Sequence, residues 1–206
     1  VQNTPGAQVT PDGLLINLTR FQKGEQAGGR AIRTGVFYLP AKSADARHYR
    51  GSNQLGYGGE ERFTGETLLR KPLFVKGATG GEAPEQAYSD IKGKDALKEM
   101  TGDAYKAILS TGNYMHPMPM HEKVGVIEKF IEKYAPDYVD SGLADEIVMY
   151  SQKGNTLRYA LQELAVAQAV RDAGYDSVVG YSKKKVGPAI SEVFDVREQT
   201  FPSKYG

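Results

Sequence analysis

Four basic residues near the start of the chain and one glutamate near its end have the types and spacing that could support chemistry. The basic residues lie within a span of fourteen positions in and around a glycine-rich stretch. They are Arg20, Lys23, Arg30 and Arg33. Cations beside exposed backbone amides are suited to binding a diphosphate. Glu192 alternates with Val193 in the last apolar run. A carboxylate on a strand can stabilise a developing cationic carbon or accept a hydrogen bond from a sugar hydroxyl.

Both features also have a purely structural explanation. Arginine and lysine usually lie on the protein surface and need no ligand there. A glutamate on a terminal strand usually faces solvent at the edge of a sheet. The sequence therefore leaves two interpretations of Glu192 open, a functional carboxylate and an exposed edge residue.

Three other motifs are weak signals for a ligand. Residues 77–81 are rich in glycine like a phosphate-binding loop, but they lack the Gly-Lys-Ser/Thr ending that reaches phosphate and magnesium. His116 and His121 lie close to Glu122 and could supply zinc ligands, yet their spacing fits no known arrangement on one helix face. We favour a surface turn there and predict no metal site. We expect the lysines at 183–185 to form a solvated hairpin tip rather than an anion site.

The composition indicates an ordinary domain without a strong overall charge. None of the 206 residues is cysteine, which excludes a disulfide framework, a thiolate metal site and a cysteine nucleophile. Lys and Arg total 26 against 25 Asp and Glu, so the formal net charge of +1 gives no overall field to hold a nucleic acid or an anionic membrane. No apolar run approaches the about 18 to 20 residues that cross a bilayer, and the first six residues lack the features of a signal peptide. We expect no membrane partner, and a location in the cytosol or, after export, in a host cell.

Hydrophobic periodicity predicts strands towards both ends of the chain and helices between them. The first dozen residues, punctuated by proline and glycine, are predicted to form a tail or loop. Strands are predicted at residues 14–21, 36–39, 67–75 with a break at Pro72, 175–181 and 189–195. Helices are predicted at residues 43–49, across 84–150 with a break near 114–121, and at 155–173, where Asn155 caps the helix and Gly174 ends it.

This order of elements predicts an α+β fold rather than a series of strand-helix-strand units. The chain is long enough to bury one core by itself, so we predict a single domain over residues 1–206 with a helical segment at about 84–150. Loops are predicted at residues 51–62 and 182–188. Recognition of a target would depend on these loops, since loops commonly carry binding residues.

Four segments, in order along the chain, resemble the ADP-ribosyltransferase-like domains of bacterial toxins, effectors and phage proteins. Residues 18–25 are similar to a first strand that ends in a basic residue followed by glycine, here Lys23 and Gly24. Residues 35–40, with Ala46 and Tyr49 after them, resemble an aromatic strand and a short helical motif. Residues 69–75 are similar to a strand that contains Pro-Leu. The last segment reads DAGYDSVV at 172–179, then a turn, then EVFD at 192–195.

The resemblance implies an ADP-ribosyltransferase-like split β-sandwich with a helical insertion. It implies that NAD is the substrate, that NAD lies in a cleft between two small sheets, and that the enzyme is a glycosyltransferase that transfers ADP-ribose to a macromolecular acceptor, expected to be a protein. Glu192 would be the catalytic carboxylate that supports cleavage of the nicotinamide bond through an oxocarbenium-like state. The residues that the resemblance assigns to NAD binding are Arg20, Lys23, Gly24, Tyr38 and Tyr49.

Three positions depart from the family pattern. Lys23 stands where the family usually has arginine, which replaces a forked donor by a point charge. Leu39 stands at a Ser/Thr position, and Ile190 stands four residues before Phe194, where many relatives have the glutamate. Because strand side chains alternate, we expect Glu192 to face the same way as position 190, about 7 Å along the strand.

These departures motivate an alternative from another class of function. The chain would then be a catalytically degenerate domain of the same fold that acts as a binding or structural module, such as a virion component or an inhibitor of another protein. A further possibility is an NAD glycohydrolase, in which water replaces the macromolecular acceptor.

Overall fold

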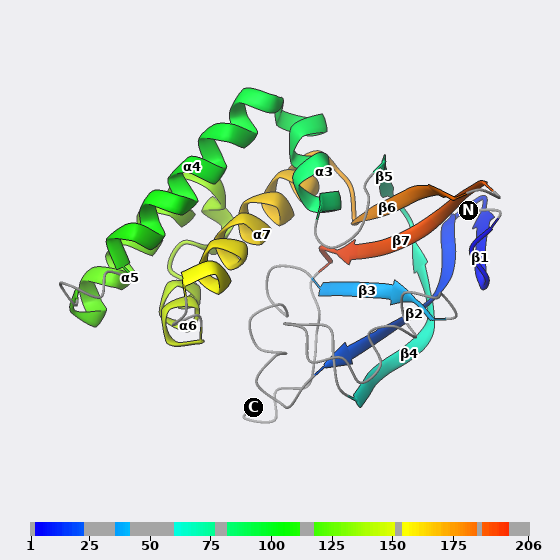
Figure 1. The fold of residues 1–206 in the computed structure, drawn as a ribbon, viewed down its shortest axis with the longest axis horizontal. Helices are drawn as coiled ribbons and strands as arrows, with labels where there is room; N and C mark the ends of the chain where they lie inside the picture. Colours follow the sequence, from blue (N-terminus) through cyan, green and yellow to red (C-terminus); the bar gives the residue numbers. More distant parts are fainter. Residues whose placement is uncertain are drawn as a thin grey trace. The chain divides into compact units, whose positions relative to one another are not determined.

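The computed structural model describes residues 3–22, 36–41, 60–76, 82–111, 118–150, 154–184 and 187–197. The chain divides into two compact units (Figure 1). The strand-rich unit comprises Val1–Ala87 and Val170–Gly206, and the helical unit comprises Tyr88–Ala169. The predicted helix at 43–49, the loop residues 51–59 and the glycine-rich residues 77–81 lie outside the described residues.

A curled sheet of seven strands makes up most of the described part of the strand-rich unit (Figure 1). The strands are β1 (Ala7–Thr10), β2 (Gly13–Gln22), β3 (Val36–Pro40), β4 (Glu60–Leu69), β5 (Pro72–Lys76), β6 (Ser177–Lys184) and β7 (Gly187–Asp195). Their order is β1-β2-β3-β7-β6-β5, and β4 pairs with β2 outside this path. Only the β5–β6 pair is parallel among these strands. With the helices described below, this arrangement confirms the predicted α+β class.

The core of the strand-rich unit forms where apolar side chains of β2 meet those of β6 and β7. Leu14, Ile16 and Leu18 alternate along β2 and are almost fully buried, as expected for a strand with one face in a core. They belong to one buried cluster with Tyr38, Leu69, Val179, Ile190 and Val193. Each fully buried aliphatic side chain contributes about 1.5 to 3 kcal/mol to folding. The cluster therefore holds the two halves of the curled sheet against each other.

The prediction of a tail or loop over the first dozen residues was wrong. Ala7–Thr10 forms β1 and pairs with β2, with Ala7 opposite Ile16. The turn between these strands needs glycine at position 13, because Gly13 has a φ of 138° and a Cβ there would lie 2.1 Å from the carbonyl oxygen of Leu69. Proline and glycine near the N-terminus thus mark a hairpin.

Strands extend into both predicted loop ranges. Residues 60–62 belong to β4, which pairs with β2 along its length. Most of the turn predicted at 182–188 belongs to strands, because β6 continues to Lys184 and β7 begins at Gly187. The predicted break at Pro72 is confirmed, since β4 ends at Leu69 and β5 begins at Pro72 on the outermost strand of the path. Proline is tolerated at the first position of such a strand because it cannot donate to a ladder.

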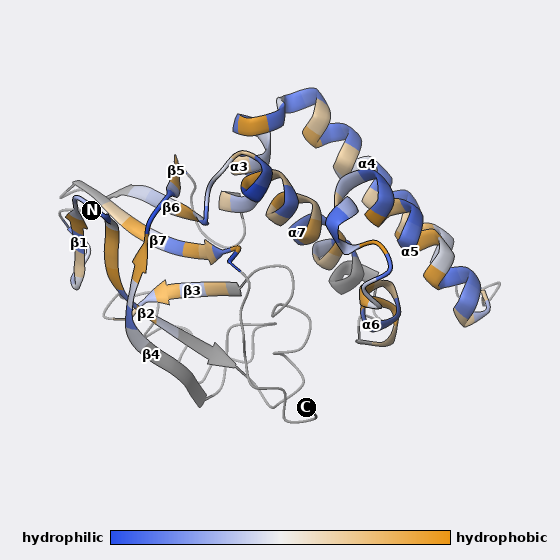
Figure 2. Ribbon diagram, turned by 180° about the vertical axis from the view of Figure 1, so that it is seen from behind, coloured by the Kyte–Doolittle hydropathy of each residue, from blue (hydrophilic) through white to orange (hydrophobic). Residues whose placement is uncertain are grey.

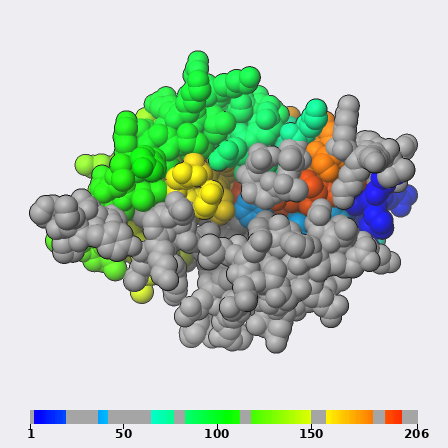
Figure 3. All heavy atoms as spheres, viewed as in Figure 1, coloured from blue at the N-terminus to red at the C-terminus, as the bar shows by residue number. Residues whose placement is uncertain are grey.

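Helices fill the chain between β5 and β6. They are α3 (Glu82–Lys92), α4 (Lys94–Thr111), α5 (Met120–Tyr134), the 3-10 helix η1 (Pro136–Tyr138), α6 (Leu143–Tyr150) and α7 (Gly154–Asp172). The helical unit contains α4, α5, η1, α6, the greater part of α7 and the C-terminal end of α3. Figure 2 shows hydrophilic and hydrophobic residues alternating along α4, as in an amphipathic helix. In Figure 3 the green side chains of α4 form part of the visible surface of this unit.

The helical unit is held by apolar packing and by two polar links. Met100, Ile127 and Leu161 are buried residues of α4, α5 and α7. Gln168 of α7 donates from its amide to Asp137 of η1 at 2.7 Å. Among the described helices, none is long and apolar enough to cross a membrane.

The second polar link joins α4 to α5 through Asp103. Its carboxylate accepts a hydrogen bond from Lys133 at 2.7 Å and one from the Tyr134 hydroxyl at 2.6 Å. Lys133 also donates to Glu99. The hydrogen bond from Lys133, followed by that from Tyr134, holds the pKa of Asp103 below its usual value. Burial, followed by the hydrogen bond to Asp103, raises the pKa of Tyr134 to about 12.

We predict that Asp103→Asn makes the stability of the helical unit less sensitive to acid, because it removes the carboxylate that Lys133 and Tyr134 contact. A depressed pKa in the folded state stabilises the protein above the unfolded-state pKa of about 4, and this stabilisation is lost as the pH falls through the folded value. The variant should lose about 1 kcal/mol of unfolding free energy at neutral pH. As the pH falls below about 4, its unfolding free energy should decrease less than that of the wild type. Urea unfolding followed by helical circular dichroism measures both, with exposed Asp95→Asn on the same helix as control. The same acid dependence in wild type and variant would contradict the prediction.

Candidate functional site

Glu192 lies on a central strand and not at the edge of the sheet. Strand β7 pairs with β3 on one side and with β6 on the other. Glu192 is 4% exposed. The interpretation of Glu192 as a solvent-facing edge residue was therefore wrong, because β7 is terminal in the sequence but internal in the sheet. A buried carboxylate is a candidate for function, since its burial costs free energy.

A β-bulge determines which way Glu192 faces. Glu192 pairs with Gly180, whereas Ile190 pairs with Tyr181, so Ser191 is the additional residue on β7. Ile190 belongs to the apolar core cluster. A Cβ at Gly180 would lie 3.3 Å from Ser191 Oγ and 3.5 Å from Glu192 Cγ, so both side chains are on the Gly180 side. The expectation that Glu192 faces the same way as position 190 was wrong, because the extra residue breaks the alternation.

The face of the sheet that carries Glu192 also contacts the first turn of α3. A Cβ at Gly180 would lie 2.9 Å from Ala83 Cβ of that turn. Phe194, two residues after Glu192, is on the same face and stacks on Phe37 with ring centroids 4.6 Å apart. Glu192 therefore shares its face of the sheet with Phe194 and with the first turn of α3.

Tyr38 lies on the opposite face of the same sheet. It pairs with Val193 and is buried at 6% exposure in the core cluster with Ile190. Because Val193 and Glu192 point to opposite faces, the structure does not bring the Tyr38 and Glu192 side chains together. Leu39, at the expected Ser/Thr position, is also buried.

The other candidate NAD-binding residues are placed only in part. Arg20 is in β2, and its backbone pairs with Phe63 of β4 immediately before a register shift. Lys23, Gly24 and Tyr49 lie outside the described residues, as do Arg30 and Arg33. No group of three or more histidine, aspartate or glutamate side chains within the described ranges could hold a metal ion.

The aspartates of the C-terminal motif have architectural roles. Asp176 accepts hydrogen bonds from the backbone amides of Arg70 and Lys71, at 2.7 and 3.1 Å, and one from the Ser177 hydroxyl. It thereby fixes the turn between β4 and β5 against the start of β6. Gly174, with a φ of 85°, ends α7 as predicted, and the Tyr175 amide donates to the Val170 carbonyl oxygen.

Asp195 forms an ion pair with Arg197 at the end of β7. Arg197 donates from Nη2 to Asp195 at 2.6 Å and from Nε to the same carboxylate at 2.9 Å. It also donates to the Leu68 carbonyl oxygen and to the Thr67 hydroxyl of β4. The hydrogen bond to Asp195 raises the pKa of Arg197. This guanidinium group joins the end of β7 to the end of β4.

Sequence reasoning missed Ser191 as a neighbour of Glu192. Ser191 is 6% exposed, and its Oγ has no hydrogen-bond partner within the part of the chain that the structure describes. An unsatisfied buried hydroxyl costs about 1 to 3 kcal/mol. The available signal was Gly180, because an isolated glycine within a strand pattern indicates a bulge or a close backbone approach. The site thus offers a buried carboxylate beside a hydroxyl group, a combination suited to a ligand with sugar hydroxyls.

Comparisons of the chain with protein-family models, with curated proteins and with solved structures gave no significant match.

We predict that Gly180→Ala destabilises the strand-rich unit by about 1 to 3 kcal/mol, because the new methyl group would overlap Ala83 Cβ. Ala83→Gly removes that obstacle, so the double variant should recover about 1 kcal/mol relative to the sum of the single changes. Urea unfolding of the four proteins in this double-mutant cycle measures the coupling. Strictly additive effects would show that the two positions do not touch.

We predict that Arg197→Met lowers the unfolding free energy by about 3 kcal/mol, because it leaves the buried Asp195 carboxylate without its charged partner. Arg197→Lys keeps the charge but not the fork and should lose less. Thermal and urea unfolding compare the two variants with the wild type. Wild-type stability of the methionine variant would rule out this role of the pair.

Proposed function

We propose that the protein is a mono-ADP-ribosyltransferase with an ADP-ribosyltransferase-like split β-sandwich fold and a helical insertion. It would bind NAD and transfer ADP-ribose to a macromolecular acceptor. Support comes from the order of the resembling segments, whose apolar runs form β2, β3, β5, β6 and β7. The observation that carries the proposal is the burial of Glu192 on the central strand of the motif that resembles the family.

The proposed reaction breaks the bond between the nicotinamide nitrogen and the ribose carbon. The electron pair of that bond leaves with nicotinamide, and the acceptor then supplies the pair for the new bond to ribose. The positive charge that develops on the ribose ring would be stabilised by the Glu192 carboxylate. The Ser191 hydroxyl, beside Glu192 on the same side of Gly180, would hydrogen-bond the ribose.

The roles proposed for the other residues come from the family resemblance, since Lys23, Gly24 and Tyr49 lie outside the described residues. Arg20, Lys23 and Gly24, at and beyond the end of β2, would hold the diphosphate, and Tyr49 would contact the nucleotide. Tyr38 lies in the core on the face opposite Glu192. Glu192 and Tyr38 would therefore not line the same side of one NAD molecule, and the contribution of Tyr38 would be to packing.

The alternative, a catalytically degenerate module of the same fold, is favoured by a separate set of observations. Leu39 and Ile190 are buried apolar side chains at two positions where the family has polar ones. The bulge also turns Glu192 away from the face that Ile190 occupies. Such a module would act through its surface, as a virion component or an inhibitor. Titration calorimetry with NAD separates the two functions, because absence of binding at millimolar NAD favours the module.

We predict that Glu192→Gln lowers transfer of labelled ADP-ribose from NAD to proteins of a lysate by about a hundredfold or more, since it removes the charge that stabilises the oxocarbenium-like state. Glutamine has nearly the same shape, so folding should persist and circular dichroism should be unchanged. Glu66→Gln, at an exposed glutamate on β4, is the matched control and should keep wild-type activity.

Equal labelling by the wild type and Glu192→Gln would overturn the assignment of Glu192. Release of nicotinamide without any added acceptor would instead identify water as the acceptor and the protein as an NAD glycohydrolase.

A further inference from the structure

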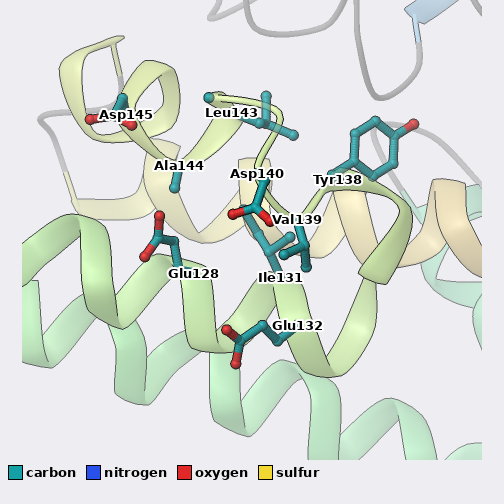
Figure 4. Close-up of a pocket in the computed structure, with 10 residues that line it drawn as sticks. Glu128, Ile131, Glu132, Tyr138, Val139, Asp140, Leu143, Ala144 and Asp145 are labelled. Carbon is teal, nitrogen blue, oxygen red and sulfur yellow. The ribbon is translucent and has the colours of Figure 1, made fainter.

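A groove in the helical unit has features of a binding site that the proposed reaction does not use. It lies between α5 and the segment formed by η1, the following turn and the start of α6 (Figure 4). Its volume is about 290 Å³. This is at the small end of the range for ligand pockets, which suits one or two long side chains better than a folded surface.

Apolar side chains form part of the groove lining. Ile131 of α5 and Leu143 and Ala144 of α6 line it and are buried. Val139 forms part of the wall and is 39% exposed. Of these four apolar side chains, Val139 is therefore the one that an entering side chain could contact.

Four carboxylates surround this apolar surface. They belong to Glu128, Glu132, Asp140 and Asp145. Figure 4 shows the Glu128 carboxylate rising from α5 towards Ala144 at the start of α6. No Lys, Arg or His side chain of the described residues forms an ion pair with any of the four. Their charge is thus not neutralised within the described part of the unit.

The charge of the whole helical unit has the same sign. Of the 26 Lys and Arg residues nine lie in Tyr88–Ala169, and of the 25 Asp and Glu residues twelve do, so this unit carries a formal charge of −3. A cationic ligand would therefore be attracted to the unit and retained in the groove. Metal ions are not the expected cation, because no set of three ligating side chains converges in the described ranges.

The turn that carries Asp140 is fixed before any ligand arrives. Asp140 has a φ of 60°, a backbone conformation that aspartate tolerates better than most residues. The Ser141 hydroxyl donates to the Tyr138 carbonyl oxygen at 2.7 Å and accepts from the Leu143 amide at 3.3 Å. A preformed groove loses less entropy on binding than one that must be ordered.

We propose that this groove docks an arginine-bearing basic segment of a partner protein. The hydrocarbon stem of an arginine would lie against Val139 while its guanidinium group pairs with carboxylates of the groove. Arginine fits better than lysine because its planar fork can pair with two carboxylate oxygens at once. The inference does not rest on the proposed transferase activity, because it concerns binding alone.

Fluorescence anisotropy with a labelled hexapeptide, Gly-Arg-Ala-Arg-Ala-Gly, tests the proposal on the full chain without NAD. The wild type should bind this peptide more tightly than the same peptide with lysine in place of arginine, and binding should weaken as salt is added. The double variant Glu128→Gln/Asp140→Asn should bind the peptide about tenfold more weakly than the wild type. The matched control, Asp95→Asn/Glu122→Gln, removes the same charge from exposed positions outside the groove and should bind as the wild type does.

Equal loss of affinity in the groove variant and the control would overturn the proposal, because it would show attraction by net charge alone. Absence of binding to the wild type at millimolar peptide would also overturn it. Amide chemical-shift mapping on the wild type provides a test that needs no variant. Peptide-induced shifts should concentrate at Glu128, Glu132 and residues 138–145, and shifts elsewhere without changes at these positions would refute the groove as the site.

Discussion

The strand-rich unit depends on the position of β7 between β3 and β6. Its two ladders of hydrogen bonds join the half of the sheet that contains β1, β2 and β4 to the half that contains β5 and β6. The same strand contributes Ile190 and Val193 to the apolar core on one face. Even the N-terminal segment is attached to it, since the Ile190 amide donates to the buried Thr4 hydroxyl at 2.8 Å. Any function of Glu192 is therefore built on a strand that is paired on both sides.

The bulge opposite Gly180 makes this strand serve both the core and a polar layer. Without an extra residue, strict alternation would place the side chains of positions 190 and 192 on one face. Ser191 interrupts that alternation, so Ile190 packs in the core while Ser191 and Glu192 lie on the Gly180 side. Glycine is required on the partner strand because a methyl group there would meet Ala83 of α3. Gly180 and the bulge opposite it thus allow two things at one place. The first turn of α3 packs closely against β6, and Glu192 is buried on the same face.

The sequence was sufficient to predict elements whose pattern is local. The helix predicted at 155–173 has a stripe of leucines and a glycine stop, and α7 occupies Gly154–Asp172. The predicted cap was wrong, because Asn155 lies within the helix. Non-local relationships could not be predicted in this way. The terminal position of β7 in the chain suggested an edge strand, because sequence order does not show which strands become neighbours. The pairing of Asp195 with Arg197, and the contacts from Arg197 to Thr67 and Leu68, likewise depend on strand order.

The near-neutral charge of the chain conceals an uneven distribution. The helical unit has a formal charge of −3 and the strand-rich unit, with 17 Lys and Arg against 13 Asp and Glu, has +4, which together give the net +1. The small net charge excludes an electric field that extends over the whole chain. Each unit can still attract ligands of the opposite charge, because screening limits its field to about 8 to 10 Å at physiological salt. An anionic dinucleotide and a basic peptide would therefore each be attracted to a different unit. The two proposed binding events differ in the sign of the ligand charge, so they would not compete for the same surface.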